Sequence, residues 1–501
     1  MATNTNILIS DNLETFSLVW LDINVNVIKE NVTAQQELRS SINHIRTFET
    51  TEECEKYIRQ SNQDRITFIV SDKFGQDIVP RIHDQPQITS IYVFCFNCST
   101  HEQWTLKYRK VKNVSNQISD LISQIKGDRR RQKIEEPMPI SVAERSSTEI
   151  DGGFLHYQLF LQILTQMDSI PSEKEELLEL CRQTYYGNPS ELRIIEEFEK
   201  DYHNDNALWW YTRESFVYRT LNKAFRTHND NFLLLSRFLI RDIRDQLSRE
   251  QLSLPIRVYR GQLMYPEELI VLQSSVGSLI SMKSFLSTSM NREYTLFCLN
   301  SGTDSSMECV LFEIEADPRL TNVKPFADIS FHSQFPDEKE VLFMAGCIFR
   351  LTNMRKENTI NIIELTLVSD EDHDLKELFT HVKKEIGTKN NFFTLANLLL
   401  RSGKLDAAEK CARRHLKELP EGHRYVPLCY DILGGILNER GEYDEAIQTL
   451  QKALQIYQQT YPSTSPVIAT IYNTIGAAYQ GKGDLNGALD AYEKALNIDK
   501  Q

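Results

Sequence analysis

The chain has 501 residues, of which 41% are hydrophobic and 25% are charged, and its formal net charge at pH 7 is −14. A single hydrophobic core rarely organises so long a chain, so the length predicts about three domains. The negative balance argues against a broad nucleic-acid interface, and the sequence has no apolar run of about 18 residues that could span a bilayer. We therefore expect neither nucleic acid nor a membrane as a partner.

The composition also predicts a cellular compartment. The nine cysteines are an odd number and are scattered along the chain, which favours reduced thiols over a disulfide framework. The N-terminal residues have neither the basic start nor the apolar stretch of a signal peptide. A cytoplasmic location is therefore expected.

Residues 1–126 alternate short apolar segments with helical patterns, which predicts a parallel doubly wound sheet. Asp22 and Asp72 lie at or just past two strand ends, where such sheets bind ligands. The pattern resembles a bacterial receiver domain, but a receiver usually has an acidic pair at its first strand end, and here Ile23 follows Asp22. Recognition or packing is the expected role, and a two-component signalling output is the alternative. The expected strands are 16–22, 44–48, 66–71 and 91–96, with helices at 30–42, 51–60 and 115–125.

Residues 127–150 predict a charged linker. The sequence DRRRQK at 128–133 is followed by EEPMP at 135–139. Dense charge and proline are both unfavourable inside a packed element, so this segment is expected to separate two domains.

Residues 151–370 change from helical to strand-like texture, which predicts an α+β domain. Pro171-Ser172 with Glu175 resembles a capping box that opens one of the helices. Aromatic residues follow a helical period between 209 and 225, and we interpret them as core. The strand-like segments lie around Val258 and at 279–285, 309–314, 340–344, 347–351 and 361–367.

Two motifs in this domain combine a cation, a glycine and hydroxyl groups. Arg260 stands beside Gly261 in a β-rich run. The arginine fork suits a phosphate or carboxylate, and a glycine lets a ligand approach the backbone. The second motif is Ser287-Thr288-Ser289, whose hydroxyls must find hydrogen bonds if they are buried.

A third motif is the pair of carboxylates at Glu338 and Glu340, at the entry to an apolar, β-prone run. Residues two apart in a strand point to the same face, so both side chains are expected to project together. Adjacent carboxylates repel each other and need a cation or a proton nearby, which favours a site. A solvated strand entry is the alternative.

In this order, the three motifs resemble the Arg-Ser-Glu (Glu-x-Glu) class of mono-ADP-ribosyltransferases, which includes arginine-modifying vertebrate ectoenzymes and bacterial toxins. The resemblance covers about residues 200–367. It implies a two-sheet fold with NAD, or NADP, as co-substrate in a cleft between the sheets. It also implies transfer of ADP-ribose to a protein and no metal.

The resemblance further implies a role for each residue. Glu340 would stabilise the oxocarbenium ion formed as nicotinamide leaves, and Ser287 would hold Glu340 and the nicotinamide ribose. Glu338 would bind the acceptor guanidinium and take its proton, which predicts arginine as the acceptor. Arg260 would bind a phosphate or ribose. The implied cofactor-binding set is Arg260, Gly261, Ser287, Thr288 and Ser289, and residues 326–335, with Phe331 and Phe335, would form the acceptor-recognition loop.

Two alternatives to protein modification stay open at this point. Water could replace the acceptor, which would make the protein an NAD glycohydrolase. The domain could instead be vestigial, leaving a non-catalytic scaffold.

Residues 390–501 repeat a pattern of small residues. The glycines of the three repeats are spaced about 40 residues apart, which is typical of paired-helix repeats. The pattern resembles three tetratricopeptide repeats, the last two with the longer spacing of kinesin-light-chain-like arrays, and implies a bound protein partner. The matched positions are Gly403, Gly441 and Gly483; Ala408, Ala446 and Ala488; Ala396, Gly434 and Gly476; and Leu416, Leu454 and Leu496.

Overall fold

The computed structural model describes residues 12–500 except 40–41, 62–63, 129–137, 144–151, 168–169, 301–306, 335, 370–391, 421 and 424. The chain divides into two compact units. The first unit comprises Met1–Glu144, Lys174–Asn229 and Asp242–Ser369, and the second comprises Arg145–Glu173, Asp230–Arg241 and Asp370–Gln501. This division has a boundary at Ser369/Asp370, beside the predicted limit at 370, while Arg145–Glu173 and Asp230–Arg241 cluster with the C-terminal residues. The predicted domain limits stay a prediction.

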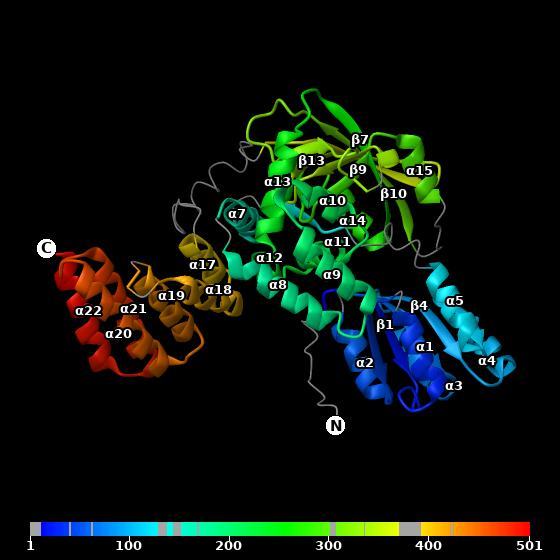
Figure 1. Ribbon diagram of the computed structural model, residues 1–501, viewed down its shortest axis with the longest axis horizontal. Helices are drawn as coiled ribbons and strands as arrows, with labels where there is room; N and C mark the ends of the chain where they lie inside the picture. The colour runs from blue at the N-terminus through cyan, green and yellow to red at the C-terminus, as the bar shows by residue number, and fades with distance from the viewer. Residues whose placement is uncertain are drawn as a thin grey trace. The chain divides into compact units, whose positions relative to one another are not determined.

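The first sheet is parallel and has five strands in the order β2-β1-β3-β4-β5. This order is that of doubly wound flavodoxin-like folds, and it confirms the predicted architecture of the N-terminal region. Helices follow the strands along the chain (Figure 1). The elements are β1 (Phe16–Leu21), α1 (Lys29–Arg39), β2 (His44–Phe48), α2 (Thr51–Gln60), β3 (Arg65–Ser71), α3 (Asp72–Ile82), β4 (Ile88–Phe94), α4 (Cys98–Thr105), β5 (Val111–Ser115) and α5 (Ile118–Asp128).

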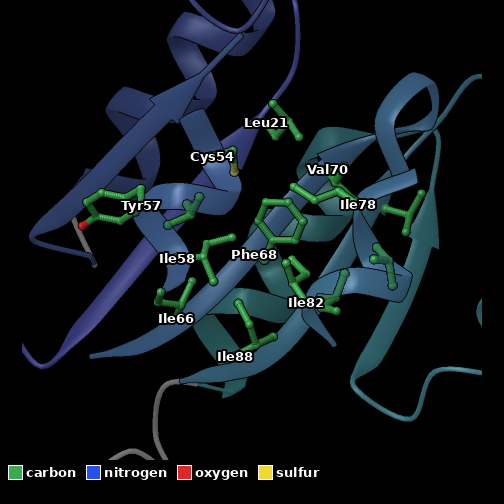
Figure 2. Packing of buried hydrophobic residues seen from close by; sticks show 14 of the residues in the cluster. Leu21, Cys54, Tyr57, Ile58, Ile66, Phe68, Val70, Ile78, Ile82 and Ile88 are labelled. Atoms are coloured by element: carbon green, nitrogen blue, oxygen red, sulfur yellow. The ribbon is translucent and has the colours of Figure 1, made fainter. Parts of the chain in front are cut away.

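Both faces of this sheet are buried, which explains the continuous apolar runs of its strands. Phe68 and Val70 of β3 pack with α2 and α3 residues on one face (Figure 2). Trp20 of β1 and Ile69 of β3 pack on the other face against α1 and α5. Successive residues of one strand therefore belong to two separate cores.

The second sheet contains nine strands in the order β11-β12-β9-β7-β10-β14-β13-β8-β6. The pair β10–β14 is parallel and the other pairs are antiparallel. One residue pair, Tyr259 opposite Ser289, joins β7 to β9. The strands that were expected to form two sheets therefore follow one continuous order, and a single residue pair connects them at the junction between β7 and β9. The strands are β6 (Ile140–Ala143), β7 (Ile256–Met264), β8 (Leu279–Met282), β9 (Leu286–Ser289), β10 (Glu308–Ala316), β11 (Phe326–Asp328), β12 (Glu340–Phe343), β13 (Ile348–Glu357) and β14 (Ile360–Leu367).

Two local predictions are wrong. Part of the predicted linker is ordered, because Ile140–Ala143 pairs with β8 at the edge of the second sheet. The predicted capping box uses the wrong glutamate: Ile170 N donates to Glu173 Oε2 at 3.1 Å. The linker and the capping box were each predicted from a few residues. In both cases the structure depends on a hydrogen-bonding partner that those residues do not reveal. The helices beside this sheet are α8 (Pro171–Thr184), α9 (Pro189–Asp201), η3 (Asn204–Asn206), α10 (Ala207–Thr212), α11 (Phe216–Thr227), α13 (Arg237–Arg249), α14 (Pro266–Ser274), α15 (Arg292–Asn300) and η4 (Pro336–Glu338).

Helix α11 makes buried ionic contacts with the N-terminal domain inside the first unit. Lys223 Nζ lies 2.6 Å from Asp64 Oδ1 and donates to Glu14 O at 2.6 Å. Arg219 Nε and Tyr185 Oη both donate to Glu14 Oε1, at 3.0 and 2.5 Å. Burial lowers the pKa of Lys223, whereas the nearby Asp64 carboxylate acts to raise it. These groups are stable away from water because they are paired with one another.

The second unit includes three consecutive helix pairs after α7 (Gly152–Gln166) and α12 (Asp230–Leu235). Gly403, Gly441 and Gly483 occupy the turns and have φ angles of 71°, 80° and 87°, which favour glycine. The helices are α17 (Phe392–Arg401), α18 (Leu405–Glu418), α19 (Val426–Glu439), α20 (Tyr443–Thr460), α21 (Pro466–Lys482) and α22 (Leu485–Asp499).

The small residues of the repeats mark close helix contacts. A Cβ atom added to Gly434 would lie 2.4 Å from Leu450 Cγ, and one added to Gly476 would lie 2.7 Å from Tyr492 Cε1. Ala408 and Ala446 are fully buried, whereas Leu496 is 51% exposed. The small positions therefore specify the packing more strictly than the leucine positions do.

Replacing Lys223 by methionine should strongly destabilise the first unit, because Asp64 would lose its buried counter-ion. We expect a loss of about 3–5 kcal/mol in the free energy of unfolding. Urea unfolding followed by tryptophan fluorescence measures it, since Trp20, Trp104, Trp209 and Trp210 all lie in the first unit. As a control within the same unit, Lys126→Met removes an exposed pair with Glu37 and should change the stability by less than about 1 kcal/mol. Equal effects of the two variants would contradict the proposed importance of the buried network.

The adjacent glycines Gly434 and Gly435 should respond in opposite directions to alanine. Gly434→Ala creates the contact with Leu450 and should weaken α19–α20 packing by about 1–3 kcal/mol. A Cβ at Gly435 would lie 3.9 Å from Leu400 Cδ2, so Gly435→Ala should stabilise the helix by about 0.5–1 kcal/mol. Hydrogen–deuterium exchange of residues 426–460 measures both effects, and faster exchange in Gly435→Ala would contradict the assigned packing.

Candidate active site

The structure brings the three sequence motifs onto neighbouring strands. Strands β12, β9 and β7 lie side by side in the sheet order. Ser289 of β9 is opposite Glu340 of β12 on one side, and it is opposite Tyr259 of β7, the residue before Arg260, on the other. Segments far apart in the sequence are therefore separated by one strand in the fold.

Arg260 lines a small pocket, and its guanidinium donors are only weakly engaged in hydrogen bonds. Its Nη1 lies 3.5 Å from Ser287 O and its Nη2 lies 3.5 Å from Gln262 Oε1, both at the outer limit of a hydrogen bond. Its Nε is buried and has no hydrogen-bond partner among the residues that the structure describes. A guanidinium with weakly engaged donors is suited to an anionic group.

The charged side chains that line the pocket are all positive among the described residues. Arg226 of α11 joins Arg260 in the lining, and no carboxylate lines the pocket within the described part of the chain. Its volume is about 40 Å³, whereas whole-cofactor pockets usually measure about 300–1,000 Å³. The pocket therefore fits one group, such as a phosphate. The other lining residues are Met138, Pro139, Tyr211, Tyr218, Asn222, Gln262, Met282, Ser284, Phe285, Leu286 and Ser287.

Sequence analysis missed the contribution of helices α10 and α11 to this pocket. Tyr211 Oη donates to Asn222 Oδ1 at 3.2 Å, and Asn222 Nδ2 donates to Tyr218 O at 3.0 Å. These bonds orient the amide on the pocket wall. One feature of the sequence could have indicated this wall of the pocket. Asn222 and Arg226 are four residues apart, which places two polar side chains on one helix face within an aromatic segment.

The predicted strand geometry of the two carboxylates is wrong. Glu338 ends the short helix η4, and Glu340 begins β12. Lys339 between them has a φ angle of 45°, which is uncommon for a residue with a side chain. The two glutamates are therefore separated by a tight turn rather than aligned on one strand, and strain of this kind often accompanies functional sites.

The hydroxyls of β9 hold this turn in place. Thr288 Oγ1 donates to Val341 O at 2.7 Å, and Ser289 Oγ donates to Glu338 O at 3.0 Å. The register places Ser289 directly opposite Glu340, whereas Ser287 is opposite Leu342. The contact between Ser287 and Glu340 stays a prediction.

Glu340 is more enclosed than its neighbour. Its side chain is buried, and Ser333 Oγ lies 3.4 Å from its Oε2. Glu338 is half-buried. Neither glutamate lines the Arg260 pocket, so the pocket and the two carboxylates occupy separate places on the sheet. We refer to the Arg260 pocket below as the anion pocket.

Tyr294 of α15 is a neighbour of Glu338 that no sequence motif indicated. Burial raises the pKa of Tyr294 to about 12, and the Glu338 carboxylate and the Cys298 thiol contribute to the increase. A phenol that stays protonated near Glu338 can donate a hydrogen bond to an acceptor group there.

The structure gives Gly261 a packing role. A Cβ atom at Gly261 would lie 3.3 Å from Thr295 Cγ2 and 3.4 Å from Thr295 O, so the open side of this glycine faces α15. The expectation that Gly261 admits a ligand to the backbone stays a prediction.

Phe331 of the expected acceptor loop is 97% exposed. Phe335 of the same loop lies outside the described residues. Among the described residues, no group of three or more His, Cys, Asp or Glu side chains is arranged to hold a metal ion. No helix in the described part of the chain combines the length and the apolar character needed to cross a bilayer.

Residues 193–376 match the family model of the ADP-ribosyltransferase exoenzymes, and residues 429–501 match a tetratricopeptide repeat model. The chain carries an ADP-ribosyltransferase exoenzyme domain. Enzymes of this family use NAD as the donor of ADP-ribose, so the domain is a transferase domain, and the repeats follow it in the sequence.

Several solved bacterial ADP-ribosyltransferases are similar to parts of the chain. The C3 exoenzyme of Clostridium limosum is 18% identical with a TM-score of 0.26, covering 33% of this chain and 84% of that one. HopU1 of Pseudomonas syringae pv. tomato is 16% identical with a TM-score of 0.27, covering 45% and 100%. Exoenzyme S of Pseudomonas aeruginosa, solved with human 14-3-3 protein beta and carba-NAD, is 15% identical with a TM-score of 0.26, covering 38% and 88%. No curated protein matches the chain.

Proposed function

We propose that the domain transfers ADP-ribose from NAD, or NADP, to an arginine side chain of a target protein and releases nicotinamide. The observation that carries the proposal is the buried Glu340 beside a strained turn that β9 fixes from the adjacent strand. Arginine as the acceptor is supported by Glu338, because a carboxylate there can bind a guanidinium with two hydrogen bonds.

In the proposed reaction, the bond between the ribose C1′ and the nicotinamide nitrogen breaks first. Positive charge develops on the ribose, and the fixed carboxylate of Glu340 stabilises it where it forms. The acceptor nitrogen then attacks C1′, and Glu338 takes the proton that this nitrogen loses. Nicotinamide leaves with the electron pair of the broken bond.

The anion pocket would bind the other end of the donor. Arg260 and Arg226 supply two permanent positive charges for a phosphate group, and Ser287 contributes at the rim. Since the pocket accepts one such group, the rest of the dinucleotide would lie outside it, toward Glu338 and Glu340. The steps of the proposed reaction assign its charge stabilisation to Glu340 and its proton removal to Glu338, and they do not call for a metal.

The repeats would choose the protein target. A partner held by the tetratricopeptide helices would be present at a high effective concentration near the transferase domain. A cytoplasmic location stays a prediction from the scattered cysteines.

Replacing Glu340 by glutamine should abolish turnover while NAD binding largely survives. The substitution keeps the side-chain size but removes the charge that stabilises the oxocarbenium ion. We expect kcat to fall by about a hundredfold to a thousandfold or more. Release of labelled nicotinamide measures turnover, and NAD binding is measured by calorimetry. The control is Glu315→Gln, which alters an exposed glutamate paired with Arg257 on the same sheet. Unchanged turnover in Glu340→Gln would overturn the assignment of Glu340.

Glu338 should separate transfer from hydrolysis. With labelled NAD and agmatine, a small guanidine, the wild-type protein should form ADP-ribosyl-agmatine. Glu338→Ala should lower this transfer by about a hundredfold, because the acceptor loses its carboxylate partner and its base, while slow NAD hydrolysis continues. If the wild-type protein yields free ADP-ribose alone with agmatine present, the protein is a glycohydrolase and arginine transfer is excluded.

A further inference from the structure

A second cavity lies wholly within the second unit and takes no part in the proposed transferase reaction. It has a volume of about 250 Å³. Its apolar walls come from three helical regions, through Met167, Leu234, Phe392, Phe393 and Tyr425. A cavity of this size can enclose a small organic molecule but not a nucleotide cofactor.

A buried arginine with an unused donor lines this cavity. Arg237, the first residue of α13, is 4% exposed. Its Nε donates to Glu173 Oε2 at 2.8 Å. Its Nη1 is buried and has no hydrogen-bond partner within the described ranges of the chain. Buried guanidinium donors are normally satisfied, so an unsatisfied donor on a cavity wall points to a ligand that supplies the acceptor.

The charges around the cavity favour a single negative charge. Arg414 of α18 adds a second guanidinium, and Glu173 is the one carboxylate among the described lining residues. Burial raises the pKa of Glu173, and Arg237 and Arg414 oppose that shift. Burial and the charge of Arg237 lower the pKa of His415, so that imidazole is neutral at pH 7. Two arginines against one glutamate leave an excess of one positive charge.

The cavity lining is also aromatic. Phe392 stacks on His415 with ring centroids 4.2 Å apart and an interplanar angle of 14°. Phe393 meets Tyr425 with centroids 5.0 Å apart. Flat apolar surfaces of this kind favour a planar ring as the body of a ligand.

We propose that this cavity binds a small aromatic monocarboxylate. The carboxylate accepts hydrogen bonds from Arg237 Nη1 and from Arg414, and the ring lies among Phe392, Phe393 and Tyr425. A monocarboxylate matches the single excess positive charge better than a phosphate monoester, which carries nearly two negative charges at pH 7. The cavity volume suits a ligand about the size of an aromatic amino acid.

Calorimetric titration of the full-length protein tests the proposal with 3-phenylpropionate as the probe. We expect saturable one-to-one binding, and we expect 3-phenylpropanamide, which has the same shape without the charge, to bind at least about tenfold more weakly. Phenyl phosphate should also bind more weakly than the carboxylate. Tighter binding of phenyl phosphate would overturn the choice of a monocarboxylate, and equal binding of the amide would overturn the role of the arginines.

A matched pair of variants on α18 locates the binding site. Arg414→Gln should weaken 3-phenylpropionate binding by about tenfold to a hundredfold, because it removes a charge-assisted hydrogen bond. Arg413→Gln changes the adjacent residue, whose 62% exposed side chain pairs with Glu409, and should leave the affinity unchanged. Equal affinity in both variants, or no binding to the wild-type protein at millimolar concentration, would overturn the proposal.

Arg237 is tested in a way that does not depend on its role in folding. Arg237→Gln can still donate to Glu173, so we expect a folded protein that has lost the probe affinity. Circular dichroism confirms folding, and if this variant fails to fold, the Arg414 and Arg413 pair decides the outcome. A folded Arg237→Gln protein with wild-type affinity would refute the assigned anion contact.

Discussion

The hydrogen bonds from β9 to the turn before β12 are the contacts on which the candidate site depends. Thr288 and Ser289 bind backbone oxygens on either side of Glu340. They add to the backbone hydrogen bonds from Met290 N to Lys339 O and from Ile329 N to Glu340 O, at a turn that holds Lys339 at a positive φ angle. The hydroxyl groups of Thr288 and Ser289 therefore help to position the carboxylates. Because β9 lies between β12 and β7, the glutamates are one strand away from Arg260.

The narrow junction between β7 and β9 explains why two subsites form. A single residue pair joins these strands, so the sheet can change direction there without breaking many ladder hydrogen bonds. The anion pocket opens beside β7, and the carboxylates sit beyond β9. A donor that spans the junction would have its phosphate and its ribose held by different groups of strands.

The elements that the sequence predicted well are those with strong local signals. The apolar strands β1, β3 and β4 are buried on both faces, and the glycine turns of the repeats need positive φ angles, so both leave clear patterns. The site motifs at Arg260, Ser287 and Glu340 were visible because charged or hydroxyl residues interrupt apolar strands. The other features depend on distant contacts. Examples are the edge strand at Ile140–Ala143, the turn at Lys339 and the helical wall at Asn222, none of which has a distinct local period.

Helix α11 contacts the N-terminal sheet domain and also lines the anion pocket. Arg219 and Lys223 are bonded to the N-terminal sheet domain, while Asn222 and Arg226 form part of the anion pocket. The segment that matches the transferase family begins at residue 193, yet the acidic partners of Arg219 and Lys223 precede it, at Glu14, Glu191 and Asp64. A fragment cut at the family boundary would therefore leave two basic side chains facing solvent where they now meet acidic partners. The segment that matches the transferase family therefore shares a buried ionic interface with the residues that precede it, so its packing extends beyond its boundary in the sequence.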